Sequence, residues 1–178
     1  MKIVVVVGDH ADPHAALAVP LGQWLAARDV HLLTGGGGGV MEAVSRAFVE
    51  TPRRRGMAIG VLPAGKPGYP NRWVEIAIRT HLHGKETAEG KQGEKDDPLG
   101  FYSRNRINAL TGDLLIALPG GGGTYAELRL AREAGKLTFV LLADGQTVGG
   151  RNAAQLAQER FTVVNSFASL QAEISKHL

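Results

Sequence analysis

The chain has 178 residues, 44% of them hydrophobic and 21% charged, and this length suits one compact domain, 1–178, with a buried core. It contains no cysteine, which excludes disulfides and thiolate sites, and its longest purely apolar run, Ile3–Val7, is too short to cross a bilayer. Lysine and arginine (20) barely exceed aspartate and glutamate (17), so the net charge of +3 does not indicate a nucleic-acid or membrane partner. Without cysteine or a cleavable signal pattern in its first residues, the chain is expected in the cytoplasm.

Stretches typical of strands alternate with stretches typical of helices. Lys2–Val7 is a continuous β-branched run, as expected for a strand buried on both faces. In chain order we expect strands at Lys2–Val7, His31–Leu33, Met57–Leu62, Trp73–Ile78, Asp113–Leu118 and Leu137–Leu142, helices at Pro13–Ala27, Val40–Glu50, Phe101–Leu110 and Thr124–Ala134, and two short elements after them. Residues 84–99 lack apolar periodicity and are expected to form a mobile surface loop. The alternation predicts an α/β fold, a single Rossmann-like, doubly wound, mostly parallel sheet with helices on both faces.

Nine of the 24 glycines lie in two blocks, each between an expected strand and an expected helix. Gly35–Gly39 follows the second strand, and Gly120–Gly123 follows the apolar run at 114–117. A bare glycine turn exposes the unpaired N–H groups at a helix start, where the helix dipole also favours an anion. Because ligands of doubly wound sheets bind beyond the carboxyl ends of the strands, the two turns are expected to hold the two ends of one nucleotide.

Standard nucleotide fingerprints are not met. Neither glycine block completes G-x-G-x-x-G, and the first expected strand is followed by Gly8-Asp9-His10 without that pattern. Gly60–Lys66 matches the opening of a P-loop, G-x-x-x-x-G-K, but Pro67 stands where the Mg²⁺-binding hydroxyl is needed. We therefore interpret Gly60–Lys66 as a turn.

Glu127 has two interpretations. Thr124-x-x-Glu127 has the spacing of a capping box, and on this pattern alone capping is favoured. The alternative is a carboxylate one turn into the helix that faces the ribose of a nucleotide bound on the glycines. There it would stabilise an oxocarbenium-like centre or activate water, as carboxylates do in glycoside cleavage.

A second polar cluster lies at Ser103–Asn108. Arg104 could clamp a phosphate or a base edge through its forked guanidinium, with Asn105 and Asn108 adding neutral donors and acceptors. We expect Arg106 on a solvated helix face and Arg53–Arg55 in a solvated turn. His81-x-His83 has no carboxylate partner in a firm pattern, so no metal site is predicted.

Taken together, Gly35–Met41, Arg104 and Pro119–Glu127 resemble the LOG ("Lonely guy") superfamily, which was long mislabelled lysine decarboxylase. Its signature P-G-G-x-G-T-x-x-E is matched at every fixed position from Pro119 to Glu127, and Arg104 matches the arginine fifteen residues before the signature proline. The resemblance implies a metal-free, cofactor-free, homodimeric phosphoribohydrolase that converts a nucleoside 5′-monophosphate to free base and ribose 5-phosphate.

The resemblance also assigns the site residues. Glu127 and Arg104 would be catalytic. The residues expected to bind the phosphate and nucleotide are Gly120, Gly121, Gly122, Gly123, Thr124, Gly36, Gly37, Gly38, Met41 and Asn105.

The chain departs from the cytokinin-activating enzymes of that superfamily. Asn105 stands where they carry lysine after the arginine, and Glu42 follows Met41 where they usually have glycine. Residues 69–75 and 103–105 are closer to the branch with molybdenum-cofactor carrier proteins. The main alternative is therefore a non-catalytic carrier of a phosphorylated ligand. A single-strand nucleic-acid binder is weaker, because only 6% of the residues are aromatic.

Overall fold

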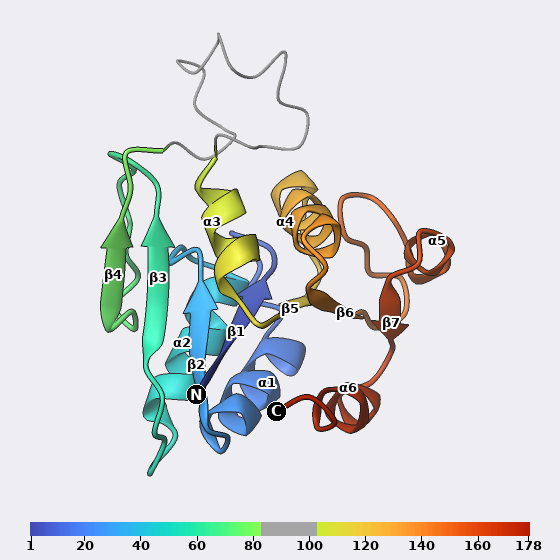
Figure 1. Cartoon of the computed structure of the whole chain (residues 1–178), viewed down its shortest axis with the longest axis horizontal. Helices are drawn as coiled ribbons and strands as arrows, with labels where there is room; N and C mark the ends of the chain where they lie inside the picture. Colours follow the sequence, from blue (N-terminus) through green and yellow to red (C-terminus); the bar gives the residue numbers. More distant parts are fainter. Residues whose placement is uncertain (83–102) are drawn as a thin grey trace, which may run out of the picture.

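The computed structural model describes residues 1–82 and 103–178, and its framework is a seven-stranded sheet in the order β4-β3-β2-β1-β5-β6-β7 (Figure 1). All neighbouring strands pair in parallel. This confirms the expected α/β fold, with a sheet that is entirely rather than mostly parallel in the part described. The strands are β1 (Lys2–Val7), β2 (Val30–Thr34), β3 (Ala58–Leu62), β4 (Ile76–Arg79), β5 (Leu114–Ala117), β6 (Leu137–Leu141) and β7 (Thr162–Val164).

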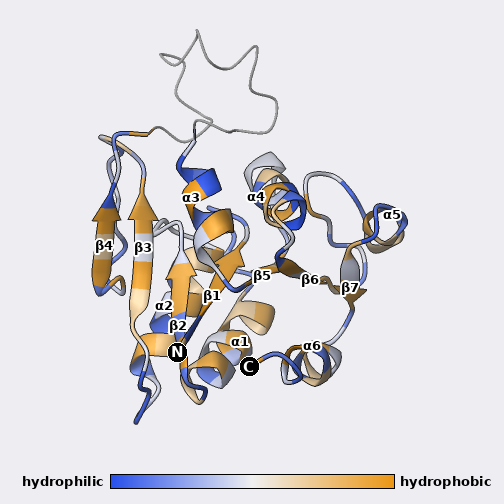
Figure 2. Cartoon of the chain, viewed as in Figure 1, coloured by the Kyte–Doolittle hydropathy of each residue, from blue (hydrophilic) through white to orange (hydrophobic). Residues whose placement is uncertain are grey.

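Helices cover both faces of the sheet, as expected. One core cluster packs α1 (Ala15–Ala26), α2 (Val40–Glu50) and α6 (Phe167–Ile174) against one face. The other packs α3 (Arg104–Thr111), α4 (Gly122–Glu133) and α5 (Ala153–Gln158) against the opposite face. In Figure 2 the strands are largely hydrophobic, whereas the helices carry both hydrophobic and hydrophilic residues. Because alternate residues of β1 enter the two clusters, its unbroken β-branched run follows from burial on both sides.

Most element boundaries differ from the sequence predictions by one to three residues, and two of these differences have a clear structural context. The expected strand Trp73–Ile78 starts at Ile76 instead, because Asn71 holds the preceding residues in a turn, its side-chain oxygen accepting from the Trp73 N–H at 3.0 Å. The expected helix Thr124–Ala134 starts two residues earlier, at Gly122. The loop predicted at 84–99 lies outside the described residues.

The strand order places the point where the chain reverses direction between β1 and β5. From β1 the chain proceeds outward through β2, β3 and β4, and it then returns to add β5, β6 and β7 on the other side. A crevice forms at such a point beyond the carboxyl ends of the strands. Gly8, Gly35 and the turn at 118–121 all lie at this edge. In the part of the chain that the structure describes, no helix is long and apolar enough to cross a membrane.

Candidate functional site

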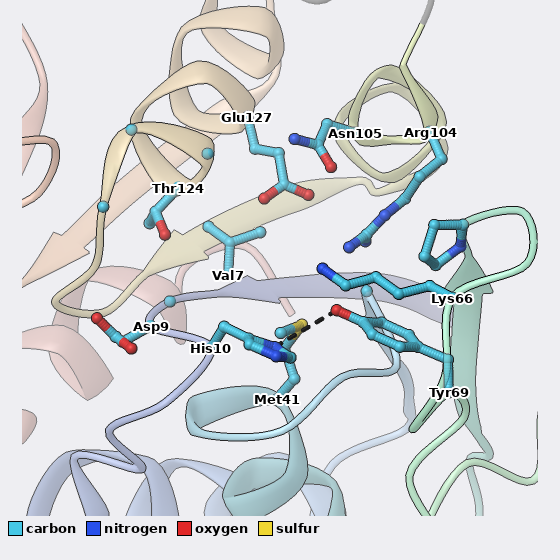
Figure 3. A pocket seen from close by; sticks show the side chains of 16 residues that line it. Val7, Asp9, His10, Met41, Lys66, Tyr69, Arg104, Asn105, Thr124 and Glu127 are labelled. Atoms are coloured by element: carbon cyan, nitrogen blue, oxygen red, sulfur yellow. Dashed lines mark hydrogen bonds between the residues drawn. The ribbon is translucent and has the colours of Figure 1, made fainter. Parts of the chain in front are cut away.

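A cavity of about 600 Å³ opens at the carboxyl ends of the central strands. Its walls come from segments that are far apart in the sequence, namely the turn after β1, the first glycine after β2, the loop after β3, and the first turns of α3 and α4 (Figure 3). The lining residues are Val7, Gly8, Asp9, His10, Gly35, Met41, Pro63, Lys66, Tyr69, Arg104, Asn105, Gly121, Gly122, Gly123, Thr124 and Glu127.

The glycine turn after β5 lines this cavity with backbone rather than with side chains. The N-cap of α4 is Gly121, and no side chain caps the helix there. A Cβ atom on Gly121 or Gly122 would meet nothing within 4 Å. Gly120 lies behind the turn, where a Cβ would come within 2.9 Å of the Asp9 backbone nitrogen and would overlap the Thr124 hydroxyl. The open N–H groups and the positive end of the α4 dipole make this wall suitable for a phosphate.

The first glycine block contributes less to the lining than expected. Gly35 and Met41 line the cavity, but Gly36–Gly38 are not among the lining residues. Residues 69–71 cover Gly36 and Gly37 instead, and Gly38 lies against the His10 carbonyl oxygen. Asn71 donates to the carbonyl oxygens of Gly36 and Gly37, both at 2.8 Å, and a Cβ on Gly37 would lie 2.6 Å from the Tyr69 hydroxyl. The block therefore supports the cavity floor through close packing.

Arg104 is buried and points into the cavity. Ser103 is the N-cap of α3 and accepts from the Asn105 N–H, so Arg104 occupies the first helical position. The Arg104 side chain crosses Gly35, where any Cβ would collide with the guanidinium. Only 8% of Arg104 is exposed, and its Nε has no hydrogen-bond partner among residues 1–82 and 103–178. A buried, unpaired guanidinium donor favours an anionic or carbonyl acceptor beside it.

Glu127 is buried beside the same cavity, where the Asn108 side-chain amide donates to its Oε1 at 2.7 Å. Burial raises the pKa of Glu127, while the nearby Arg104 charge and the Asn108 hydrogen bond act in the opposite direction. In Figure 3 the carboxylate lies between Thr124 on one side and Arg104 on the other. An acid of raised pKa in a cleft is suited to proton transfer.

The capping-box interpretation of Glu127 is wrong. Because α4 begins at Gly122, Thr124 is the third helical residue rather than the N-cap, and Glu127 lies a full turn inside the helix. Thr124 itself is buried and lines the cavity. The spacing Thr124-x-x-Glu127 therefore belongs to the signature P-G-G-x-G-T-x-x-E and not to a helix cap.

Among the cavity residues that the sequence patterns did not assign to the site, four carry polar side chains, namely Asp9, His10, Lys66 and Tyr69. The rings of His10 and Tyr69 are nearly parallel, 6° apart in plane with centroids separated by 5.9 Å, and the Tyr69 hydroxyl lies 3.4 Å from His10 Nδ1. Two signals were available, the residues directly after β1 and the unused G-x-x-x-x-G-K pattern, which ends at Lys66.

The remaining predicted features lie away from the cavity. Arg106 is half-buried rather than solvated. In the expected solvated turn, Arg54 pairs with Glu75 and is mostly buried, whereas Arg55 pairs with Asp29 at 3.0 Å and stays exposed. His81 is exposed and His83 lies outside the described residues. Among the described residues no group of three or more histidines, cysteines and carboxylates could hold a metal ion.

The model of the SLOG cluster4 family matches residues 1–171. The probable cytokinin riboside 5′-monophosphate phosphoribohydrolase LOGL9 of Oryza sativa subsp. japonica is 35% identical over 112 residues, 62% of this chain and 41% of the rice protein. The chain spans less than two thirds of the length of the curated relatives that it matches.

Two solved structures are similar over nearly the whole chain. The molybdenum cofactor carrier protein of Chlamydomonas reinhardtii is 28% identical with a TM-score of 0.69, covering 99% of this chain and 98% of the algal chain. DNA processing protein A of Helicobacter pylori is 16% identical with a TM-score of 0.66, covering 98% of this chain and 80% of that chain, which shows a shared fold alone. The expected homodimer, cytoplasmic location and lack of a nucleic-acid partner stay predictions.

Proposed function

Because the chain belongs to the SLOG cluster4 family, in agreement with its resemblance to the LOG superfamily, we propose that it is a phosphoribohydrolase. Its substrate would be a nucleoside 5′-monophosphate, cleaved to free base and ribose 5-phosphate. The observation that carries the proposal is the buried Glu127 carboxyl, which faces the cavity between the glycine turn of α4 and Arg104. The similarity to the rice phosphoribohydrolase supports it.

The substrate phosphate is placed on the wall formed by Gly121–Thr124. The N–H groups of the first α4 turn would donate to its oxygens, and the helix dipole would favour its charge. Glycine at these positions lets the backbone approach the phosphate without an intervening side chain. This anchor leaves the ribose beneath Glu127, which lies one turn further along α4.

The reaction breaks the bond between C1′ of the ribose and a nitrogen of the base. The electron pair of that bond leaves with the base, which takes up a proton, and a water oxygen forms the new bond to C1′. An ionised Glu127 would stabilise the positive charge that develops on the ribose or accept a proton from the attacking water. The Asn108 hydrogen bond and the charge of Arg104 favour that ionised form against the effect of burial.

The test is base release from a panel of nucleoside 5′-monophosphates, with the free nucleosides as controls. We expect release only from the monophosphates, and we expect Glu127→Gln to abolish it while phosphate-dependent binding persists. The matched control is Glu133→Gln, which changes an exposed carboxylate on the same helix, paired with Arg129 at 3.3 Å. Full activity in Glu127→Gln would refute the assigned role of this carboxyl.

A second candidate function is that of a carrier for a phosphorylated ligand such as molybdenum cofactor. Asn105 favours it, because this neutral amide lines the cavity at the position where the cytokinin-activating enzymes carry lysine. The similarity to the algal carrier protein over the whole chain also supports it. A tightly bound pterin in the purified protein, detected by its fluorescence after oxidation, together with no base release, would favour the carrier.

A further inference from the structure

The wall of the cavity opposite the glycine turn contains side chains that could select the base of the ligand. We propose that Lys66 and Arg104 read the base of the ligand and select a purine with a carbonyl oxygen at C6 over one with an amino group. The preferred ligands would be 6-oxopurine nucleoside 5′-monophosphates. This inference rests on the proposed function for the position of the ligand phosphate.

Two cationic side chains from different elements converge at this wall. Lys66 belongs to the loop after β3 and Arg104 to the first turn of α3, and both point into the cavity toward Glu127 (Figure 3). The Lys66 ammonium lies 5.5 Å from the centre of the Tyr69 ring, and the Arg104 guanidinium lies 6.0 Å from the same centre. Cationic side chains at the wall of a recess attract an electron-rich group of a ligand.

The group of the ligand that lies beside Lys66 and Arg104 is expected to be a purine base rather than a second phosphate. The backbone wall at Gly121–Thr124 already suits the single phosphate of the substrate. At the other wall, the near-parallel rings of His10 and Tyr69 provide aromatic groups against which a heterocycle could pack. Glu127 lies between the two walls, which places the ribose there and directs the base toward Lys66 and Arg104.

The chemistry of the two cations then decides which base fits. Lysine and arginine side chains carry hydrogen-bond donors and no acceptor. A 6-oxopurine presents the O6 and N7 acceptors, which match a forked or clustered set of donors, whereas adenine presents an amino group at C6. Adenine would therefore set its amino donor against the donors of Lys66 and Arg104.

The same contacts would assist the departure of the base. When the C1′–N bond breaks, its electron pair moves onto the purine, and on a 6-oxopurine part of that charge reaches O6. Fixed positive groups beside the developing charge stabilise it in the transition state. Lys66 and Arg104 would thus act on the leaving group, while Glu127 acts on the ribose.

Binding of three ligands tests the inference, namely inosine 5′-monophosphate, adenosine 5′-monophosphate and ribose 5-phosphate. Dissociation constants are measured by calorimetry in a Glu127→Gln background, which prevents turnover. We expect the inosine nucleotide to bind about tenfold more tightly than the adenosine nucleotide, the selectivity typical of a paired base contact. Lys66→Met should reduce that ratio to below about threefold and leave ribose 5-phosphate binding unchanged. Lys176→Met, at an exposed lysine paired with Glu173, is the control.

Two outcomes would overturn the inference: equal binding of both nucleotides to the parent protein, or an equal loss of affinity for all three ligands in Lys66→Met. The second would mean that Lys66 contacts phosphate. Base release measured on the wild-type protein separates this inference from the proposed function. Equal release from both nucleotides refutes the selectivity and supports the hydrolase, whereas selective binding without any release refutes the hydrolase alone.

Discussion

Replacing Asn108 with alanine tests whether its hydrogen bond opposes the rise that burial causes in the pKa of Glu127. Asn108 is completely buried on α3, and its amide donates to Glu127 Oε1 at 2.7 Å. That hydrogen bond favours the charged carboxylate, whereas burial favours the neutral acid. In Asn108→Ala the pKa of Glu127 should therefore rise further, because only Arg104 remains to oppose the effect of burial.

The expected loss follows from the strength of one hydrogen bond to a charged group, about 1.5–3 kcal/mol. At about 1.4 kcal/mol per factor of ten, kcat/KM for base release at neutral pH should fall roughly 10- to 150-fold. The acid limb of the pH–rate profile should move to higher pH, so that part of the lost activity returns in alkaline buffer.

The assay is the pH dependence of kcat/KM in the wild type, Asn108→Ala and the control Thr111→Ala, which changes an exposed residue of the same helix. Titration of the Glu127 side-chain carbon by ¹³C NMR, assigned by its loss in Glu127→Gln, reports the pKa without requiring turnover. An unchanged titration curve in Asn108→Ala would refute the reasoning. A uniform loss of activity at every pH would indicate a structural defect instead.

Three further predictions concern stability and binding. Because burial raises the Glu127 pKa, the folded state retains a proton at pH values where the unfolded chain has lost it. The free energy of unfolding of the wild type should therefore fall as pH rises through this interval. Urea unfolding at pH 5 and pH 8 should show that the stability of Glu127→Gln relative to the wild type is greater at pH 8. Gly120→Ala should destabilise the fold by about 1–3 kcal/mol through overpacking, while Gly122→Ala, with open space around its Cβ, should leave it unchanged or slightly more stable. Gly35→Ala should displace the Arg104 guanidinium and weaken nucleotide binding at least about tenfold, as calorimetry would show, with the far-ultraviolet circular dichroism unchanged.

The fold could be predicted because local patterns and burial agree along most of the chain. The β-branched run at Lys2–Val7 is buried on both faces as expected, and both glycine blocks follow strands. Prediction failed where tertiary contacts decide. The four residues of β4 are all exposed, so no burial pattern marked its start, which Asn71 sets by holding the preceding turn.

The candidate site could be predicted from the sequence only for the residues that belong to one motif or have a fixed spacing from it. The signature from Pro119 to Glu127 located one wall, and Arg104 followed from its spacing to that signature. Asn108 lies four residues after Arg104 and therefore on the same side of α3, which is a usable signal for its contact with Glu127. Lys66 was missed because it lies far from Arg104 in the sequence. The two residues line one cavity only because the strand order brings the loop after β3 to the same edge of the sheet as the start of α3, and no local sequence pattern contains that order.

The ionisation of Glu127 separates the two candidate functions. A carrier of an anionic ligand gains nothing from a carboxylate in its cavity, so it should bind most tightly when Glu127 is protonated, and affinity should fall as pH rises through the Glu127 pKa. A hydrolase needs the ionised carboxylate, so the single-turnover rate at saturating nucleotide should rise over the same interval. Both measurements use the wild-type protein, with Glu127→Gln as the reference for pH effects that do not involve Glu127, such as titration of the ligand phosphate. Affinity that falls with pH while no base is released at any pH would exclude the hydrolase, and a rate that rises with pH would exclude the simple carrier.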